Sequence, residues 1–270
     1  HCKVWLVHAG HHTCVYRYED RYKNAPGRRR LDKAENIAVQ TPSMIVLSSC
    51  QDLHKAADTR FRETGILQHI GVAFTGEVLY FVDVEGRAWH AGKASWRIAG
   101  GNDGEKYLKD INAHSIGIML QVEDVYKPVF TKALYNSLKK VVWELRGKYG
   151  IKGVNIVSLS EVAPGRYANV NRPGVTFDGS CFADYDNTVV NWWEVHRRMK
   201  SMQRTPCREE AVECLIRLGY DAGAQDDVVE HCFRALCARY LGRFVEDDGV
   251  KFRCAKAVSD SFAARGFFLA

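Results

Sequence analysis

Hydrophobic positions follow a strand pattern in several segments of the first two thirds of the chain. Continuous apolar runs at 43–49, 114–122 and 153–159 predict buried strands. Between 69 and 83, apolar residues alternate on either side of Thr75-Gly76-Glu77, which predicts a β-hairpin. These segments predict a sheet whose central strands are covered on both faces, because a strand with one wet face would alternate along its length.

A helical period separates the predicted strands. Residues 51–65 predict a helix that ends at Gly65. Residues 130–150 predict a longer amphipathic helix with Gly147 and Gly150 at its end, as glycine C-caps. Its apolar face consists of Phe130, Leu134, Leu138, Val142 and Leu145. Strands that alternate with helices predict an α/β fold with a mixed central sheet flanked by helices.

The pattern changes in the last third of the chain. Residues 207–221, 226–242 and 251–266 show only helical periodicity, which predicts a small three-helix bundle. The chain is therefore predicted to consist of a charged irregular extension (1–40), an α/β domain (41–185), a connector (186–206) and a three-helix module (207–270).

Composition limits the class of protein. The 46% hydrophobic and 26% charged fractions are typical of a globular domain, and the longest apolar runs are too short to cross a bilayer. Two basic runs, Arg28–Arg30 and Arg197–Arg204, contribute to the net charge of +6. A solvated face is the simpler interpretation of both runs, and contact with RNA or another acidic partner is the alternative.

The nine cysteines bear on the cellular compartment. Their number is odd, their spacing is irregular and no C-x-x-C pair occurs. This pattern favours free thiols over a disulfide framework. We therefore expect a reducing intracellular compartment or organelle, with a mitochondrion favoured over the periplasm.

Three motifs occur in a characteristic order: "RAWHAGKASWR" (87–97), "SIGIMLQ" (115–121) and "SLSEVAPGR" (158–166). Together they resemble the zinc-dependent N-acetylmuramoyl-L-alanine amidases (type 2), which are related to peptidoglycan recognition proteins. The segment "LIRLGYD" (215–221) and the helix after it resemble the peptidoglycan-binding helical module that some of these amidases carry. The resemblance covers roughly residues 40–265.

The resemblance implies a zinc ion held by two His and one Asp, with a Glu that handles the proton, for hydrolysis of the muramyl–L-alanine amide. The matching positions carry Ser48, Leu159 and Arg172 for the ligands and Met119 for the acid. None of these side chains is a practical zinc ligand. We therefore expect no zinc and no catalytic set at these positions. A metal site rebuilt from Cys50, His54 and Asn169 or Asn171 is the alternative.

The motif around position 90 is retained. In the resemblance, Trp89, His90, Trp96 and Arg97 imply a groove for glycan and peptide. The alternative is that the tryptophans pack the loop onto the sheet and that His90 holds a backbone carbonyl.

These expectations define a functional hypothesis with two alternatives. The hypothesis is a catalytically inactive amidase-like protein, not an enzyme, that serves as a structural subunit among the protein subunits of a larger complex. The first alternative is a non-hydrolytic peptidoglycan- or muropeptide-binding protein. The second is an active amidase with a rebuilt metal site.

Overall fold

A computed structural model gives the structure of the chain. It describes residues 41–53, 55, 68–98, 107–167, 172–174, 176–179, 181–182, 189–223 and 226–267, together with the backbone of 3–8 and 11–16. The predicted helix at 51–65 lies mostly outside the described residues, as do Arg28–Arg30, His54, Asn169 and Asn171.

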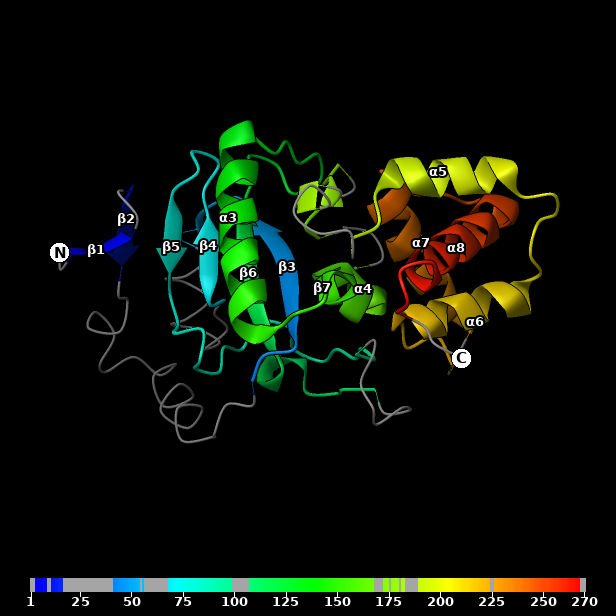
Figure 1. The fold of residues 1–270 in the computed structure, drawn as a ribbon, viewed down its shortest axis with the longest axis horizontal. Helices are drawn as coiled ribbons and strands as arrows, with labels where there is room; N and C mark the ends of the chain where they lie inside the picture. The colour runs from blue at the N-terminus through cyan, green and yellow to red at the C-terminus, as the bar shows by residue number, and fades with distance from the viewer. Residues whose placement is uncertain are drawn as a thin grey trace.

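A five-stranded sheet forms the centre of the α/β part (Figure 1). Its strands are β3 (Met44–Cys50), β4 (Ile70–Val72), β5 (Val78–Tyr80), β6 (Ser115–Gln121) and β7 (Ile156–Ser158), in the order β5-β4-β6-β3-β7. β4, β6, β3 and β7 run parallel, and β5 is antiparallel to β4. The predicted strands and hairpin are confirmed.

Helix α3 (Lys132–Tyr149) covers one face of the sheet (Figure 1). Thr131 caps its start by accepting a hydrogen bond from the Leu134 N–H, and Gly150 ends it in the left-handed conformation, with φ 67°. Gly147 lies inside the helix, so only the second predicted glycine cap is confirmed. The helix packs on side chains that alternate along the central strands, Ile45, Leu47, Ile116, Ile118 and Leu120.

The other face of the sheet packs towards the C-terminal helices. These are α5 (Trp192–Ser201), α6 (Arg208–Leu218), α7 (Asp226–Leu241) and α8 (Asp248–Ala263). Met44 and Val46 of β3 belong to one buried cluster with Leu215, Phe233 and Phe262 of these helices. Short helices lie at the junction: α4 (Leu159–Val162) and the 3₁₀ turns η3 (Gly153–Asn155) and η4 (Pro164–Tyr167), while η2 (Ile111–Ala113) precedes β6.

The predicted fold class is confirmed: a mixed sheet flanked by helices is followed by a C-terminal helical region that contains α6, α7 and α8. Two segments differ from the prediction. The extension contains a hairpin of β1 (Lys3–His8) and β2 (His11–Tyr16), whose sequences are rich in β-branched and aromatic residues. The predicted connector contains α5, which Asn191 caps and which packs on α8. None of the described helices is long and apolar enough to span a membrane.

Candidate functional site

The carboxyl ends of four parallel strands meet at one edge of the sheet. β3 ends at Cys50, β4 at Val72, β6 at Gln121 and β7 at Ser158. Ligands of open α/β sheets bind outside this edge, where the chain connections leave a crevice. The 122–130 segment leaves β6 at this edge and leads to α3 (Figure 1). This edge is therefore the first place to look for a functional site.

A second loop, 172–177, packs over the same edge. The Arg172 guanidinium donates a hydrogen bond to the Ser49 carbonyl oxygen at 2.5 Å, and the Arg172 N–H donates to Ser160 Oγ at 2.5 Å. Gly174 has φ 147°, and a Cβ there would lie 2.2 Å from Pro128 Cγ. A larger residue at Gly174 would push the 172–177 loop away from the 122–130 segment.

The four positions singled out by the motifs lie close together. Ser48 and Met119 are opposite each other in the β3–β6 register, on the sheet face away from α3, and both are buried. Ser48 Oγ accepts a hydrogen bond from Gln68 Nε2 at 3.1 Å. Leu159 opens α4 and belongs to the buried cluster shared with the C-terminal helices. Arg172 contacts the neighbours of both Ser48 and Leu159, so the four motif positions surround one place in the fold.

The side chains at these positions do not fit a zinc ion. They offer a hydroxyl, a thioether, a hydrocarbon chain and a guanidinium, whereas zinc in proteins takes cysteine, histidine and carboxylate ligands. The Arg172 guanidinium would also repel a dication. Within the described part of the chain, no group of three or more His, Cys, Asp and Glu side chains is placed to hold a metal. No catalytic step is therefore assigned to a metal at these four positions.

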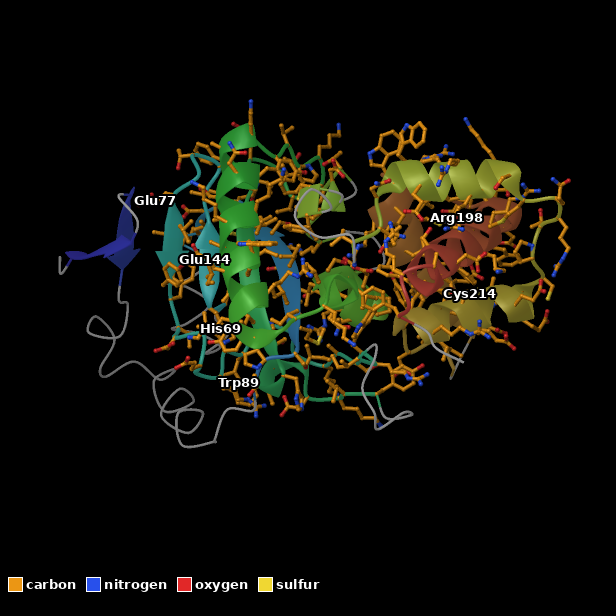
Figure 2. All side chains as sticks on the ribbon, in the orientation of Figure 1. His69, Glu77, Trp89, Glu144, Arg198 and Cys214 are labelled. Carbon is orange, nitrogen blue, oxygen red and sulfur yellow. The ribbon has the colours of Figure 1, made fainter. Side chains whose placement is uncertain are left out.

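Two buried histidines lie next to each other, towards the end of the sheet opposite the carboxyl edge (Figure 2). His69 donates Nε2–H to the Gly86 carbonyl (3.0 Å), and its Nδ1 accepts from the Gly117 N–H (2.9 Å). The His90 ring lies 5.6 Å away, with its Nε2 3.1 Å from Ser115 Oγ. Burial lowers the pKa of His69 to about 4, and burial together with His69 lowers the pKa of His90 to about 3. Both rings are therefore neutral at pH 7.

The predicted groove residues are not brought together on one open surface. His90 and Trp96 are only 4% and 2% exposed. The Trp96 ring packs against Tyr220, and the Arg97 N–H donates to the Gly219 carbonyl oxygen, so this pair contacts the C-terminal helices. Trp89 lies under the Arg87 guanidinium at 4.4 Å. Figure 2 shows His69 and Trp89 at the end of the sheet opposite the carboxyl edge. Contact of Trp89, His90, Trp96 and Arg97 with substrate stays a prediction.

A buried ion pair, which the motifs did not reveal, joins the two parts of the chain. Glu161 of α4 is 2% exposed and accepts bonds from Arg239 at 2.7 and 2.9 Å and from Tyr220 Oη at 2.6 Å. Burial alone would lower the pKa of Arg239, but the adjacent Glu161 carboxylate raises it above its usual value. The sequence indicates a structural role for Glu161 only through the Ser158-x-x-Glu161 capping box. The structure contains both hydrogen bonds of this capping box.

A recess opens beside this ion pair. It contains about 330 Å³ of empty space, part of which is open to solvent, and most of its wall is apolar. Pro173 and Gly174 of the 172–177 loop line one side of the recess, and Arg239 lines another. The other lining residues are Leu47, Ile156, Val157, Ser158, Glu161, Phe177, Gly179 and Phe182. The part of this recess comparable with an enclosed cavity is only about 20 Å³, which leaves room for about one water molecule.

Comparison with known protein families identifies the class of protein. The model of the N-acetylmuramoyl-L-alanine amidase family matches residues 38–174, half of the chain. The matched segment contains the five-stranded sheet, the carboxyl edge and Arg172. This chain belongs to the N-acetylmuramoyl-L-alanine amidase family, and the resemblance inferred from its motifs is confirmed.

Two curated relatives match the same part. The chain is similar to the 1,6-anhydro-N-acetylmuramyl-L-alanine amidase AmpD of Enterobacter cloacae, with 36% identity over 107 residues, 40% of this chain and 50% of that protein. It is also similar to AmpD of Citrobacter freundii, with 31% identity over 114 residues, 42% of this chain and 54% of that protein. The chain thus spans about half the length of the curated relatives it matches.

Solved structures show the same fold over most of the chain. AmiD from E. coli, in complex with anhydro-N-acetylmuramic acid-L-Ala-D-γ-Glu-L-Lys, covers 85% of this chain, and 91% of AmiD is covered, with a TM-score of 0.64 and 19% identity. AmpDh3 from Pseudomonas aeruginosa, in complex with an anhydromuramic pentapeptide, covers 86% of this chain, and 95% of AmpDh3 is covered, with a TM-score of 0.65 and 18% identity. These matches extend the likeness in fold into the C-terminal helices.

The comparisons correct the functional hypothesis. We expected an inactive structural subunit that is not an enzyme, but the curated relatives are named as amidases, and the structural neighbours include an amidase bound to its substrate. Nothing in these matches points to a subunit of a larger assembly. The prediction was wrong because it inferred the function of the whole protein from four motif positions alone.

The predicted compartment is also corrected. The curated relatives come from bacteria, as do AmiD and AmpDh3, so the expectation of a mitochondrial protein is contradicted. Seven cysteines of the described residues are free, but free thiols alone do not specify an organelle. The cysteine pattern was therefore too weak an argument for a compartment.

Proposed function

We propose that this chain acts on muramyl peptides as an N-acetylmuramoyl-L-alanine amidase, which hydrolyses the amide between the muramyl lactyl group and L-alanine. The observation that carries this proposal is the family match over residues 38–174. The names of the curated relatives, and the muropeptide ligands of AmiD and AmpDh3, support the same substrate class.

The carboxyl edge of the sheet is the proposed place of binding. The 122–130 and 172–177 segments border it, and Arg172 supplies a positive charge there. A guanidinium favours carboxylate groups, which muramyl peptides carry on their peptide chains. Because the side chains at Ser48, Met119, Leu159 and Arg172 do not fit zinc and the first three are buried, we propose that Arg172 binds and positions substrate without a metal at these four positions.

The test uses the whole chain with anhydro-N-acetylmuramic acid-L-Ala-D-γ-Glu-L-Lys as substrate. Mass spectrometry should detect the free L-Ala-D-γ-Glu-L-Lys peptide and anhydro-N-acetylmuramic acid. A parallel sample contains EDTA. If EDTA abolishes turnover, the reaction needs a metal, and residues other than these four hold it. Absence of cleavage at equimolar enzyme and substrate would contradict the proposal.

Contact between the basic run Arg197–Arg204 and an acidic partner remains a separate proposal. Two of its arginines are already paired, Arg198 with Glu194 and Arg204 with Glu210. Arg197 and Lys200 are exposed on α5, so they are the members of this run best placed to meet a partner.

A further inference from the structure

Helix α5 presents an unusual outer face. Figure 1 shows it along the outside of the helical region, and its buried residue, Val195, packs inward. Two adjacent tryptophans at its start are among the most exposed large hydrophobic residues of the described chain: Trp192 is 48% and Trp193 is 63% exposed. Trp193, Arg197 and Lys200 follow the i, i+4, i+7 spacing and thus share one face of the helix.

No exposed carboxylate of α5 offsets these cations. Glu194, the acidic residue of the helix, is turned inward, with a side chain only 13% exposed. The Arg265 guanidinium, at 2.5 Å, lowers the pKa of Glu194 to about 2, and Arg198 (labelled in Figure 2) adds a bond at 3.2 Å. The outer face of α5 therefore combines two indole rings with positive charge.

We propose that this face of α5 docks the protein on an anionic lipid bilayer. Tryptophan prefers the boundary between water and lipid, because its ring is apolar and its N–H is polar. Lysine and arginine on the polar side of such a helix are attracted to anionic headgroups. Trp192 and Trp193 enter the boundary region, and Arg197 and Lys200 contact the lipid phosphates.

The arrangement of the indoles favours a bilayer over a stacked base or sugar. Adjacent residues of a helix point about 100° apart, so the two rings do not form one platform for a flat ligand. Trp192 instead lies edge-on to His196, with ring centroids 5.6 Å apart and an interplanar angle of 85°. Separate rings suit insertion between lipid headgroups. This inference is independent of the proposed amidase function, because α5 lies outside the family match.

The test is sedimentation of the full chain with vesicles. One set contains phosphatidylcholine alone, and the other contains equal parts of phosphatidylcholine and phosphatidylglycerol. The wild-type chain should sediment with the anionic vesicles and be released by high salt. Trp192→Ala/Trp193→Ala should lose most binding. Arg197→Glu/Lys200→Glu should weaken binding by ~30-fold or more. Each cation near an anionic surface contributes about 1 kcal/mol, and about 1.4 kcal/mol corresponds to a tenfold change in affinity.

Controls keep the outcome clear. Trp143→Ala removes a tryptophan that is 51% exposed on α3, and it should bind vesicles like the wild type. Thermal melting checks that each variant is folded, and cleavage of soluble muropeptide should be unchanged in the α5 variants. Lack of wild-type binding to anionic vesicles would overturn the proposal, as would equal loss in Trp143→Ala. The proposal would also be overturned if the α5 face bound soluble RNA or peptidoglycan fragments but not vesicles.

Discussion

Trp96 of the amidase part packs edge-on against Tyr220 of the helical part, with ring centroids 4.9 Å apart and an interplanar angle of 64°. The Trp96 ring also lies against Gly219, where a Cβ would approach to 2.6 Å. Ser95 Oγ donates to the Asp221 carboxylate at 2.5 Å, next to the same turn. The "SWR" motif thus joins two parts of the chain in addition to any role near substrate.

Replacing Trp96 should test the strength of this junction. Trp96→Ala removes a ring that is 2% exposed, and we expect a loss of about 3–5 kcal/mol in the free energy of unfolding. Urea unfolding measures the change. Trp193→Ala, at a position 63% exposed, is the matched control and should change the free energy by about 0.5 kcal/mol or less. Similar losses in both variants would show that the Trp96 contact contributes little.

The Glu161–Arg239 pair should be sensitive to removal of one partner. Glu161→Gln leaves the Arg239 guanidinium buried beside a neutral amide, with an expected cost of about 3–5 kcal/mol. Glu85→Gln breaks an exposed pair with Lys148 and should leave the unfolding midpoint unchanged. Thermal melting of both variants makes the comparison. An unchanged midpoint in Glu161→Gln would mean that solvent reaches Arg239.

The neutral pair His69 and His90 should make stability depend on pH. Both side chains have a lower pKa in the folded state than the ordinary value of 6.5, so the unfolded chain binds more protons between about pH 4 and 6.5. Stability should therefore fall as the pH is lowered through this window, by about 1.4 kcal/mol per pH unit for each histidine. Urea unfolding at pH 7, 6 and 5 measures the slope, and His90→Gln should reduce it. An equal slope in the variant would exclude His90 as a source.

Zinc should not bind through the four motif positions. Ser48→Ala is expected to leave the zinc content of the purified chain unchanged, because Ser48 is bonded to Gln68 and its hydroxyl is a poor ligand. Ser48→His/Leu159→His/Arg172→Asp supplies three ordinary ligands and should bind additional zinc. Elemental analysis measures both. A fall in bound zinc in Ser48→Ala would contradict the assignment.

The cysteines should differ sharply in reactivity. Cys207 is exposed, whereas Cys232, Cys237 and Cys254 are fully buried. Burial raises the pKa of Cys232 to about 12, which further suppresses the reactive thiolate. Labelling with a maleimide followed by peptide mapping should detect Cys207 first and the buried thiols only after unfolding. Rapid labelling of Cys232 in the native protein would indicate local opening of α7.

The sequence predicted the sheet because strands covered on both faces form continuous apolar runs, as in Met44–Leu47. It did not predict α5, because only Val195 of that helix is fully buried and its remaining residues are aromatic, polar or charged. The Glu161–Arg239 pair joins residues 78 apart in the chain, so no local pattern could reveal it. The motifs pointed to four positions that lie close together near the carboxyl edge, but they could not show that Trp96 packs against Tyr220 of the helical part.

The buried cluster that includes Met44 and Phe262 limits how this protein can evolve. Side chains from β3, the Trp96 loop and the last helix fill a common interior, so neither part can be exchanged for that of a distant relative without mismatched surfaces. Substitutions at positions 96, 219 and 220 should therefore be inherited as compensating sets, and natural recombination between the two parts should be rare.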